Sequence, residues 1–374
     1  MKTLFLGIIF LIVSLSVVFG GHYFIYFSLL KFFDIQSVWI KLSLILSFIL
    51  LPISFVGASV LTHYFHNGFV NWFYMISGLW LGVVTTLLGF FIIVWAIYGL
   101  FALFTWNINL KILGSLALII TFFYSIYGIW NVYNPRIKEV TVNIENLPEE
   151  WQNKKIVQIS DLHLGHILGK DFFEKVIGKV NLIDSEAIFI TGDLFDGMGD
   201  DFDYVGEEIN KIKAPRGIYF VTGNHETYFG LDKVNKILEK SKIKTFDNNV
   251  FEVNGLQILG INYPDRFERI NMEESIKKIE GFDSEKPSIL LFHSPSQIKS
   301  VKNAGIDLEL CGHTHGGQLF PIGSIVKLMY YGVDRGLYTD GDFSLYTSVG
   351  TGTWGPNMRT SAPPEITIIN LNKK

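Results

Sequence analysis

Cysteine is almost absent from this chain of 374 residues, in which Cys311 stands alone. A single cysteine excludes an intramolecular disulfide and argues against a structural zinc site built from thiolates. The chain also lacks the Gly-Lys-Ser/Thr loop that cradles nucleotide phosphates, and it shows no Ser-His-Asp nucleophile pattern. We therefore expect Cys311 to be a small buried hydrophobe and any reactive centre to use other residue types.

Charge is scarce in the first part of the chain and plentiful in the second. This asymmetry predicts two domains, residues 1–135 solvated by lipid and residues 136–374 solvated by water. The second part is acidic overall and has no basic stretch typical of a nucleic-acid surface, so we expect no nucleic-acid partner. The only charged side chains before residue 136 are Lys2, Lys31, Asp34, Lys41 and Lys111.

Long apolar runs fill the first domain. Runs of about 20 apolar residues match the thickness of a bilayer's hydrocarbon core, so we predict an all-α membrane region of about four transmembrane helices. The third run is too long for one upright helix and would tilt or begin along the interface. Lysines are few on both sides, so the positive-inside rule leaves the side of the second domain undetermined. The runs are roughly 4–27, 40–62, 72–104 and 111–133.

The second domain alternates short apolar runs with amphipathic ones. This alternation predicts βαβ units and a largely parallel sheet, with strands at 155–160, 187–191 and 217–222 and helices at 170–181, 203–212 and 231–240. Further on, Asn254-Gly255 and Asp340-Gly341 indicate hairpins. Additional strands are expected at 139–144, 288–293, 307–312 and 365–371. The pattern therefore favours an α/β fold with two sheets packed face to face and flanked by helices.

Potential metal ligands follow the predicted buried strands. The second domain contains six histidines, and all but His166 lie at these strand ends. A single histidine is more often packed or solvated than functional. Ligands bind at the carboxyl edge of open α/β sheets, so we expect these side chains to converge. They are Asp161, His163, Asp193, Asn224, His225, His293, His313 and His315.

The donors are carboxylates, imidazoles and one amide, a set that suits Mn, Fe or Zn. Seven of these eight candidates are already too many for one tetrahedral ion, and seven suit two divalent ions that share a bridging carboxylate. Two ions ~3.5–4 Å apart polarise phosphoryl oxygens and lower the pKa of a shared water until it is hydroxide near neutral pH. The pattern therefore favours displacement at phosphorus.

Five ordered motifs resemble those of the calcineurin-like metallophosphoesterases: Asp161-x-His163, Gly192-Asp193, Gly223-Asn224-His225, His293 and Gly312-His313-x-His315. The resemblance covers about residues 139–371. The stretches ISDLHLG, GHTHGGQ and GTGTWGPNMR look like membrane-associated or exported members, which include lipid-A-precursor pyrophosphohydrolases and cell-envelope enzymes. The resemblance implies a four-layer α-β-β-α sandwich and a phosphodiester or pyrophosphate substrate, lipid-linked or from the cell envelope.

The resemblance also implies a role for each matched residue. One ion would be held by Asp161, His163 and His315. The second would be held by Asn224, His293 and His313, and Asp193 would bridge the two. His225 would not be a ligand; it would face the phosphate with Asn224 and protonate the leaving oxygen.

Three more residues have competing explanations. Glu226 stands where many family members have Asp, and we expect it to orient the imidazole of His225. Asp196 either holds the orientation of a ligand or caps a helix. Arg359 lies in a Gly/Pro-rich loop and either clamps a substrate phosphate bidentately or forms a surface ion pair.

Three functions compete for this chain. The first is a membrane-anchored dinuclear phosphoesterase in which a metal-bridging hydroxide attacks phosphorus. The second is a metal-binding sensor or scaffold that regulates a membrane partner without turnover, and the third is a transporter or channel with an appended enzyme. All seven ligands and His225 are present, which favours the enzyme, and the membrane region has almost no charge to line an ion path.

Overall fold

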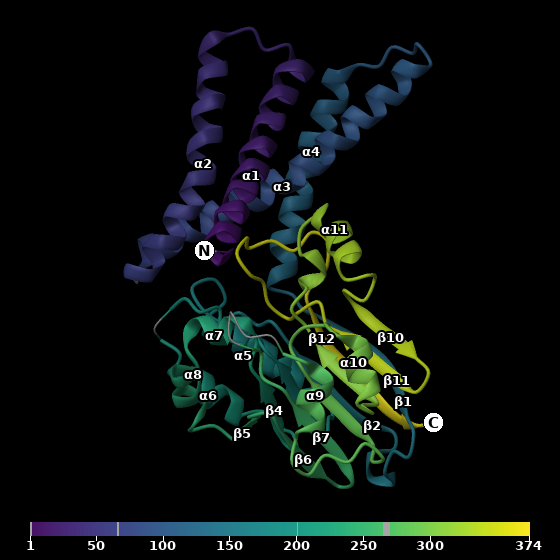
Figure 1. Ribbon diagram of the computed structural model, residues 1–374. Helices are drawn as coiled ribbons and strands as arrows, with labels where there is room; N and C mark the ends of the chain where they lie inside the picture. Colours follow the sequence, from purple (N-terminus) through teal and green to yellow (C-terminus); the bar gives the residue numbers. More distant parts are fainter. Residues whose placement is uncertain (1, 66, 200, 265–269) are drawn as a thin grey trace. The chain divides into compact units, whose positions relative to one another are not determined.

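The computed structural model describes residues 2–65, 67–199, 201–264 and 270–374 (Figure 1). The chain divides into two compact units. The helical unit contains Met1–Trp130, Leu319–Pro321 and Gly355–Thr360. The sheet unit contains Asn131–Gln318, Ile322–Trp354 and Ser361–Lys374.

The helical unit is built on four long apolar helices, which confirms the predicted membrane spans. Each holds a segment long and apolar enough to cross a bilayer. A side-chain hydrogen bond joins α1 and α3, since polar groups in lipid need a partner within the protein: Trp95 Nε1 donates to Ser28 Oγ at 2.8 Å. The helices are α1 (Lys2–Phe33), α2 (Val38–Tyr64), α3 (Gly68–Leu103) and α4 (Leu110–Val132).

Two short segments from late in the chain pack among these helices. The Phe320 ring lies 5.1 Å from the Phe90 ring of α3, measured between centroids. In α4, Gly128 O accepts the backbone N–H of Arg359 at 2.9 Å. A Cβ on Gly128 would come within 2.5 Å of Met358 Cγ, so glycine permits this close approach.

The first sheet of the sheet unit has six strands in the order β1-β12-β2-β3-β4-β5. Strands β2, β3, β4 and β5 run parallel, whereas β12 pairs antiparallel with β2. The strands are β1 (Arg136–Ile144), β2 (Lys154–Ile159), β3 (Ala187–Thr191), β4 (Ile218–Val221), β5 (Ile243–Thr245) and β12 (Glu365–Lys373). The helices that follow them are η1 (Glu149–Trp151), α5 (Lys170–Asn181), α6 (Asp203–Asn210), α7 (Asn224–Phe229) and α8 (Leu231–Leu238).

The second sheet also has six strands, in the order β10-β11-β9-β8-β7-β6. Both predicted hairpins are confirmed as the antiparallel pairs β6–β7 and β10–β11. Its strands are β6 (Asn249–Val253), β7 (Leu256–Gly260), β8 (Ser288–Leu291), β9 (Leu308–Cys311), β10 (Gly336–Asp340) and β11 (Phe343–Thr347). Its helices are α9 (Met272–Lys277), α10 (Ile298–Asn303), η2 (His315–Gly317) and α11 (Ile322–Met329).

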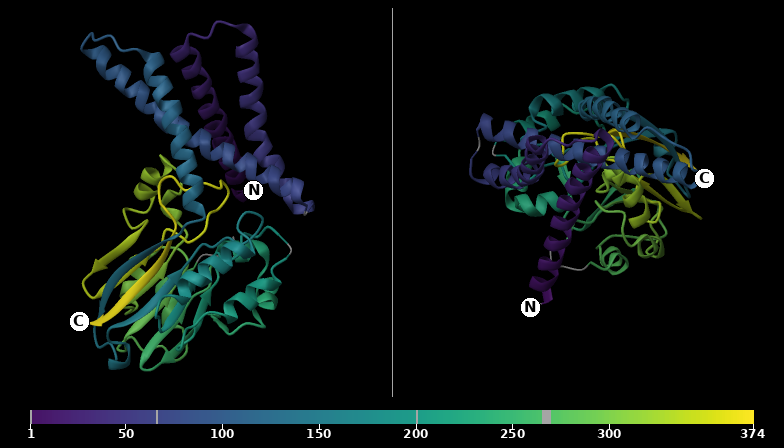
Figure 2. Two further views of the ribbon diagram at one scale, coloured as in Figure 1. Left: turned by 180° about the vertical axis from the view of Figure 1, so that it is seen from behind. Right: turned by 90° about the horizontal axis from the view of Figure 1, so that it is seen from above.

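Three apolar cores hold four layers together, and the sheets can be followed from behind in Figure 2. One core joins α5 to the first sheet, as Val176 and Ile188 show. The middle core joins the sheets, with Phe189 and Leu310 from opposite sides. The third joins the second sheet to α9 and α10. The α-β-β-α sandwich is therefore confirmed, since alternate residues of each buried strand face different cores.

Candidate metal centre

Five parallel strands deliver the predicted ligands to one place. Asp161 and Asp193 lie two residues beyond β2 and β3, and Asn224 lies three residues beyond β4. His293 and His313 follow β8 and β9 in the second sheet. The carboxyl ends of parallel strands share one edge, so alternation of strand and helix suffices to gather residues more than 150 positions apart.

The backbone at these ligands is held in a left-handed conformation. Five predicted ligands have positive φ: Asp161 (52°), His163 (48°), Asp193 (51°), His313 (71°) and His315 (49°). Such a conformation costs of order 1–3 kcal/mol for a residue with a Cβ, and it persists only where the surroundings enforce it. This concentration of strain at one cluster marks a functional site.

The first donor cluster joins Asp161, His163 and His315. The Nε2 atoms of His163 and His315 lie 3.0 Å apart, and Asp161 Oδ1 is 3.4 Å from His315 Nε2. One donor atom from each residue falls within 4.8 Å of the others, and all three residues are buried. Two imidazole nitrogens and a carboxylate oxygen that converge in this way match the ligand types of Mn, Fe and Zn.

The second donor cluster joins Asn224, His293 and His313. His313 Nδ1 lies 3.0 Å from Asn224 Oδ1 and 3.2 Å from His293 Nε2. The other ring nitrogen of His293, Nδ1, lies 2.8 Å from Thr191 O. That contact turns Nε2 toward the cluster, the outer hydrogen bond that metal-binding histidines usually have.

Asp193 lies between the two clusters. Its Oδ2 is 3.8 Å from His163 Nε2 in the first cluster and 3.1 Å from His293 Nε2 in the second. Its Oδ1 accepts the backbone N–H of His225 at 2.9 Å, which fixes the carboxylate. One oxygen therefore faces donors of both clusters.

Burial and charge together shape the ionisation of these groups. Burial works against the charge on Asp193, but the adjacent His293 lowers the pKa of this carboxyl. Burial alone would lower the pKa of His293, whereas Asp193 raises it to about 10. Burial and the charge of His293 lower the pKa of His313 to about 4, so its ring is neutral and offers a lone pair at pH 7.

These residues are suited to hold divalent cations. The donors are hard or borderline ligands: carboxylate and amide oxygens lie beside imidazole nitrogens, and the set contains no thiolate. The ring nitrogens of His163 and His315 face each other at hydrogen-bond distance in a buried space, so both rings turn a nitrogen toward the same position. This convergence of buried donors favours metal binding.

His225 stands beside the donors and is held by Asp196. Its Nδ1 lies 2.8 Å from Asp196 O, and its ring centroid is 4.5 Å from that of His163. Burial, and then the charge of His163, lowers the pKa of His225. The ring is therefore fixed through Nδ1 in a position next to the ligands.

Glu226 has partners other than the His225 ring. Its Oε2 accepts backbone N–H groups from Gly223 at 2.6 Å and Asp193 at 2.9 Å, and its Oε1 accepts from Phe195 at 3.0 Å. Burial and the Asp193 charge raise the pKa of Glu226 to about 7, while the three donors favour its ionised form. The structure shows Glu226 joining the loops after β3 and β4, and its direct part in catalysis stays a prediction.

For Asp196 and Arg359 the sequence allowed two roles each, and the structure excludes one of them in both cases. Asp196 Oδ1 is 3.5 Å from His163 Nδ1. The helix-cap alternative for Asp196 is wrong, because the N-cap of α6 is Phe202. Arg359 is fully buried and belongs to the helical unit, which excludes a surface ion pair. Its contact with substrate stays a prediction.

Two aromatic residues near the centre carry no signal in the sequence patterns. The Trp354 ring lies 5.9 Å from the His225 ring, and the Trp354 side chain is half exposed. The Tyr263 ring lies 5.8 Å from the His293 ring. Neither residue follows a predicted strand that ends in a polar ligand. A search for polar residues at strand ends therefore could not identify them.

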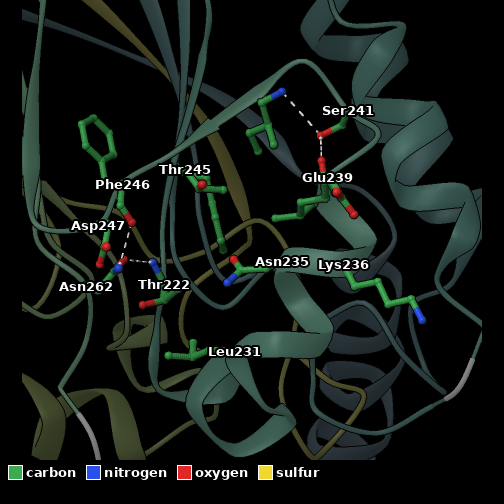
Figure 3. Close-up of a pocket in the computed structure, with 13 residues that line it drawn as sticks. Thr222, Leu231, Asn235, Lys236, Glu239, Ser241, Thr245, Phe246, Asp247 and Asn262 are labelled. Atoms are coloured by element: carbon green, nitrogen blue, oxygen red, sulfur yellow. Dashed lines mark hydrogen bonds between the residues drawn. The ribbon is translucent and has the colours of Figure 1, made fainter.

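A separate cavity of about 620 Å³ lies beside β4, β5 and α8 (Figure 3). In its wall, Asn262 Oδ1 accepts the N–H of Thr222 at 3.1 Å and Asn262 Nδ2 donates to Phe246 O at 2.8 Å. None of the predicted ligands is among the described residues that line it. Asn262 therefore fixes the end of β4, from which Asn224 follows.

Comparisons with known proteins agree with this geometry. The family model of the calcineurin-like phosphoesterases matches residues 154–317. An uncharacterized metallophosphoesterase of Campylobacter jejuni is 36% identical over 275 residues, 72% of this chain and 72% of that protein. One from Helicobacter pylori strain J99 is 35% identical over 243 residues, 64% of this chain and 65% of its own length. A Danio rerio protein, named a transmembrane protein with metallophosphoesterase domain, is 31% identical over 278 residues, 69% and 62% of the two chains.

The fold and the clustered donors define a metal-dependent phosphoesterase hydrolase attached to membrane helices. The chain belongs to the metallophosphoesterase family, as its motifs indicated. It is a multi-pass membrane protein, which confirms the predicted localisation.

Proposed function

We propose that this chain is a membrane-anchored, dinuclear phosphoesterase that hydrolyses a phosphodiester or pyrophosphate carried by a lipid or by the cell envelope. The position of Asp193 carries this proposal. Its Oδ2 faces His163 on one side and His293 on the other, as a carboxylate shared by two cations would.

The two donor clusters would each hold one divalent ion, Mn, Fe or Zn. Asp161, His163 and His315 would hold the first, and Asn224, His293 and His313 the second. When bound, such ions would polarise phosphoryl oxygens and lower the pKa of a shared water.

The chain's own residues would handle the proton and the substrate. The carbonyl of Asp196 can only accept, so it holds the proton on His225 Nδ1, and the imidazolium form, protonated on Nε2 as well, would give its Nε2 proton to the leaving oxygen. Asn224 begins α7 beside this ring and would contact a phosphoryl oxygen as well as a cation. We keep Arg359 as a further substrate contact, on the chemistry of its guanidinium alone.

The test compares Asp193→Asn with Asp340→Asn in the full chain. Asp340 is an exposed aspartate paired with Lys302 at 2.8 Å, so its substitution controls for loss of one charge. With Mn²⁺ and bis(p-nitrophenyl) phosphate, we expect Asp193→Asn to lose at least about 100-fold in kcat/KM and Asp340→Asn to stay near the native value.

Retained activity in Asp193→Asn would refute the shared carboxylate. Stoichiometric metal binding by the native chain without hydrolysis of any phosphoester would instead favour a sensor or scaffold.

A further inference from the structure

Helix α11 presents an apolar face that no described part of the chain covers. Ile325 is 55% exposed, Leu328 79% and Met329 67%. With Ile322, these side chains fall within an arc of about 120° around the helix axis. Lys327 lies outside that arc, so the helix is amphipathic, and large exposed apolar patches mark interaction sites.

This helix is fixed to the metal centre. A Cβ on Gly317, two residues after the ligand His315, would come within 2.5 Å of Gly323 Cα in α11, so the two backbones are in direct contact. The carbonyl of Gly316 accepts a hydrogen bond from Arg335 Nη2 at 2.6 Å, which holds the turn. Any surface that binds α11 therefore lies beside the turn that carries His315.

The chain around α11 is continuous with membrane-spanning elements. Phe320 packs on Phe90 of α3, and its backbone N–H donates to Thr360 Oγ1 at 2.9 Å. Leu319–Pro321 belong to the helical unit, and α11 begins at the next residue. The exposed apolar face thus follows directly on a segment packed among helices long enough to cross a bilayer.

We propose that α11 is an interfacial helix whose apolar face, formed by Ile322, Ile325, Leu328 and Met329, inserts into the surface of the lipid bilayer beside the metal centre. An amphipathic helix in this setting lies in the plane of the interface with its apolar side chains below the headgroups. Tyr331, 95% exposed just after the helix, is the kind of residue that lies at headgroup level.

Insertion of α11 into the bilayer would favour substrates that are themselves part of the membrane. If the proposed phosphoesterase function holds, on which this step rests, the favoured substrate is a phosphoester in the headgroup of a membrane lipid. Trp354, half exposed beside His225, would then contact apolar parts of the same lipid. Hydrolysis of a water-soluble phosphoester would not be accelerated by insertion of α11 into the bilayer.

The docking test needs no catalysis. Leu328→Cys and Leu182→Cys replace two leucines of similar exposure, 79% and 87%, on different surfaces of the sheet unit. Each full-length variant is labelled with an environment-sensitive fluorophore in nanodiscs, and the native chain, whose Cys311 is fully buried, reports background labelling. We expect brominated lipids to quench the label at 328 several-fold more strongly than the label at 182.

Two outcomes would overturn docking. Equal quenching of both labels by aqueous iodide would mean that α11 lies in water. Shielding of the label at 328 from both iodide and brominated lipid would mean that protein, such as a second copy of the chain, covers the face.

The substrate class is tested with Leu328→Glu and Leu182→Glu. We expect Leu328→Glu to hydrolyse phosphatidylglycerol, a phosphodiester, or CDP-diacylglycerol, a lipid pyrophosphate, in phosphatidylcholine nanodiscs roughly tenfold more slowly than the native chain, with unchanged activity on bis(p-nitrophenyl) phosphate. Leu182→Glu should match the native chain on every substrate. Hydrolysis of the soluble ester without turnover of either lipid would overturn the lipid assignment, and absence of all hydrolysis would refute the proposed function while leaving the quenching result to decide docking.

Discussion

The side-chain amide of Gln318 is hydrogen-bonded to the backbone of Trp354 through both of its groups. Nε2 donates to Trp354 O at 2.8 Å, and Oε1 accepts the Trp354 N–H at 3.2 Å. The indole held in this way lies 5.9 Å from the ring of His225. The last residue of the GHTHGGQ stretch therefore positions an aromatic side chain next to the proposed proton donor.

We predict that Gln318→Leu raises KM more than it lowers kcat. The substitution removes both hydrogen bonds from Gln318 to the Trp354 backbone, each of which contributes about 0.5–1.5 kcal/mol, and it therefore loosens the indole. Steady-state kinetics with bis(p-nitrophenyl) phosphate measures the split. Trp354→Ala should raise KM by a similar factor, because both substitutions would weaken the same contact between the indole and the substrate. The double variant should therefore have a KM close to that of either single variant. Additive effects would show that Gln318 acts elsewhere.

Asp196→Asn should weaken metal binding without abolishing it. The Asp196 carboxylate lies 3.5 Å from His163 Nδ1 and 3.8 Å from His225 Nδ1, so it supports two rings from outside the donor clusters. Loss of such outer contacts typically costs 10- to 100-fold in metal affinity or activity, and we expect a loss of about that size. Mn²⁺ titration by calorimetry measures it. An unchanged affinity would show that the backbone carbonyl of Asp196 suffices.

Gly223→Ala should disrupt the centre, whereas Gly178→Ala should not. A Cβ at Gly223 would collide with Oδ1 of Asp193, which the folded chain holds rigidly. Gly178 lies in α5, and no atom stands within 4 Å of the position that an added methyl group would take, so alanine there should stabilise the helix by about 0.5–1 kcal/mol. Thermal unfolding and Mn²⁺ binding of both variants check the contrast. Normal metal binding in Gly223→Ala would contradict the predicted clash.

A buried carboxyl outside the metal centre is expected to make stability depend on pH. Glu309 lies in β9 opposite Leu290 and Leu345, and neither of its oxygens has a hydrogen-bond partner among the described residues. Burial raises its pKa from an ordinary 4.5 to about 8. The folded chain therefore keeps a proton that the unfolded chain loses above pH 4.5.

It follows that this group favours the folded state below about pH 4.5 and that its contribution falls as the pH rises towards 8. We predict that Glu309→Gln unfolds at a higher temperature than the native chain at pH 8 and that the difference shrinks at pH 5. The exposed Glu252, paired with Lys286 at 3.0 Å, provides the control Glu252→Gln. Thermal melts with a chelator present separate this effect from metal binding. Equal shifts at both pH values would refute it.

Local patterns in the sequence were sufficient for the elements and for the set of donor residues that the structure brings together. Helix α5 matches its predicted range because its apolar residues recur at helical spacing, and both hairpins form at the Asn-Gly and Asp-Gly turns. The converging donors were recognisable because they follow apolar strands. These signals are short-range and need no knowledge of neighbouring segments.

Contacts between distant parts of the chain could not be predicted from such short-range patterns. The pairing of His163 with His315, 152 residues apart, depends on how both sheets bring their loops together. The same holds for the partners of Glu226 and for Trp354 beside His225. Helix α11 is only eight residues long, too short for a periodic pattern to stand out among the surrounding apolar residues.

The sequence by itself determined that apolar membrane helices precede an α/β phosphoesterase whose potential metal donors follow its strands, because composition and strand-end chemistry are local properties. Only the tertiary structure decided that one oxygen of Asp193 faces both sets, that Asp196 holds His225, and that α11 exposes its apolar face beside His315. The physical reason is that distances between segments are set by strand order and core packing, which no single stretch of residues encodes.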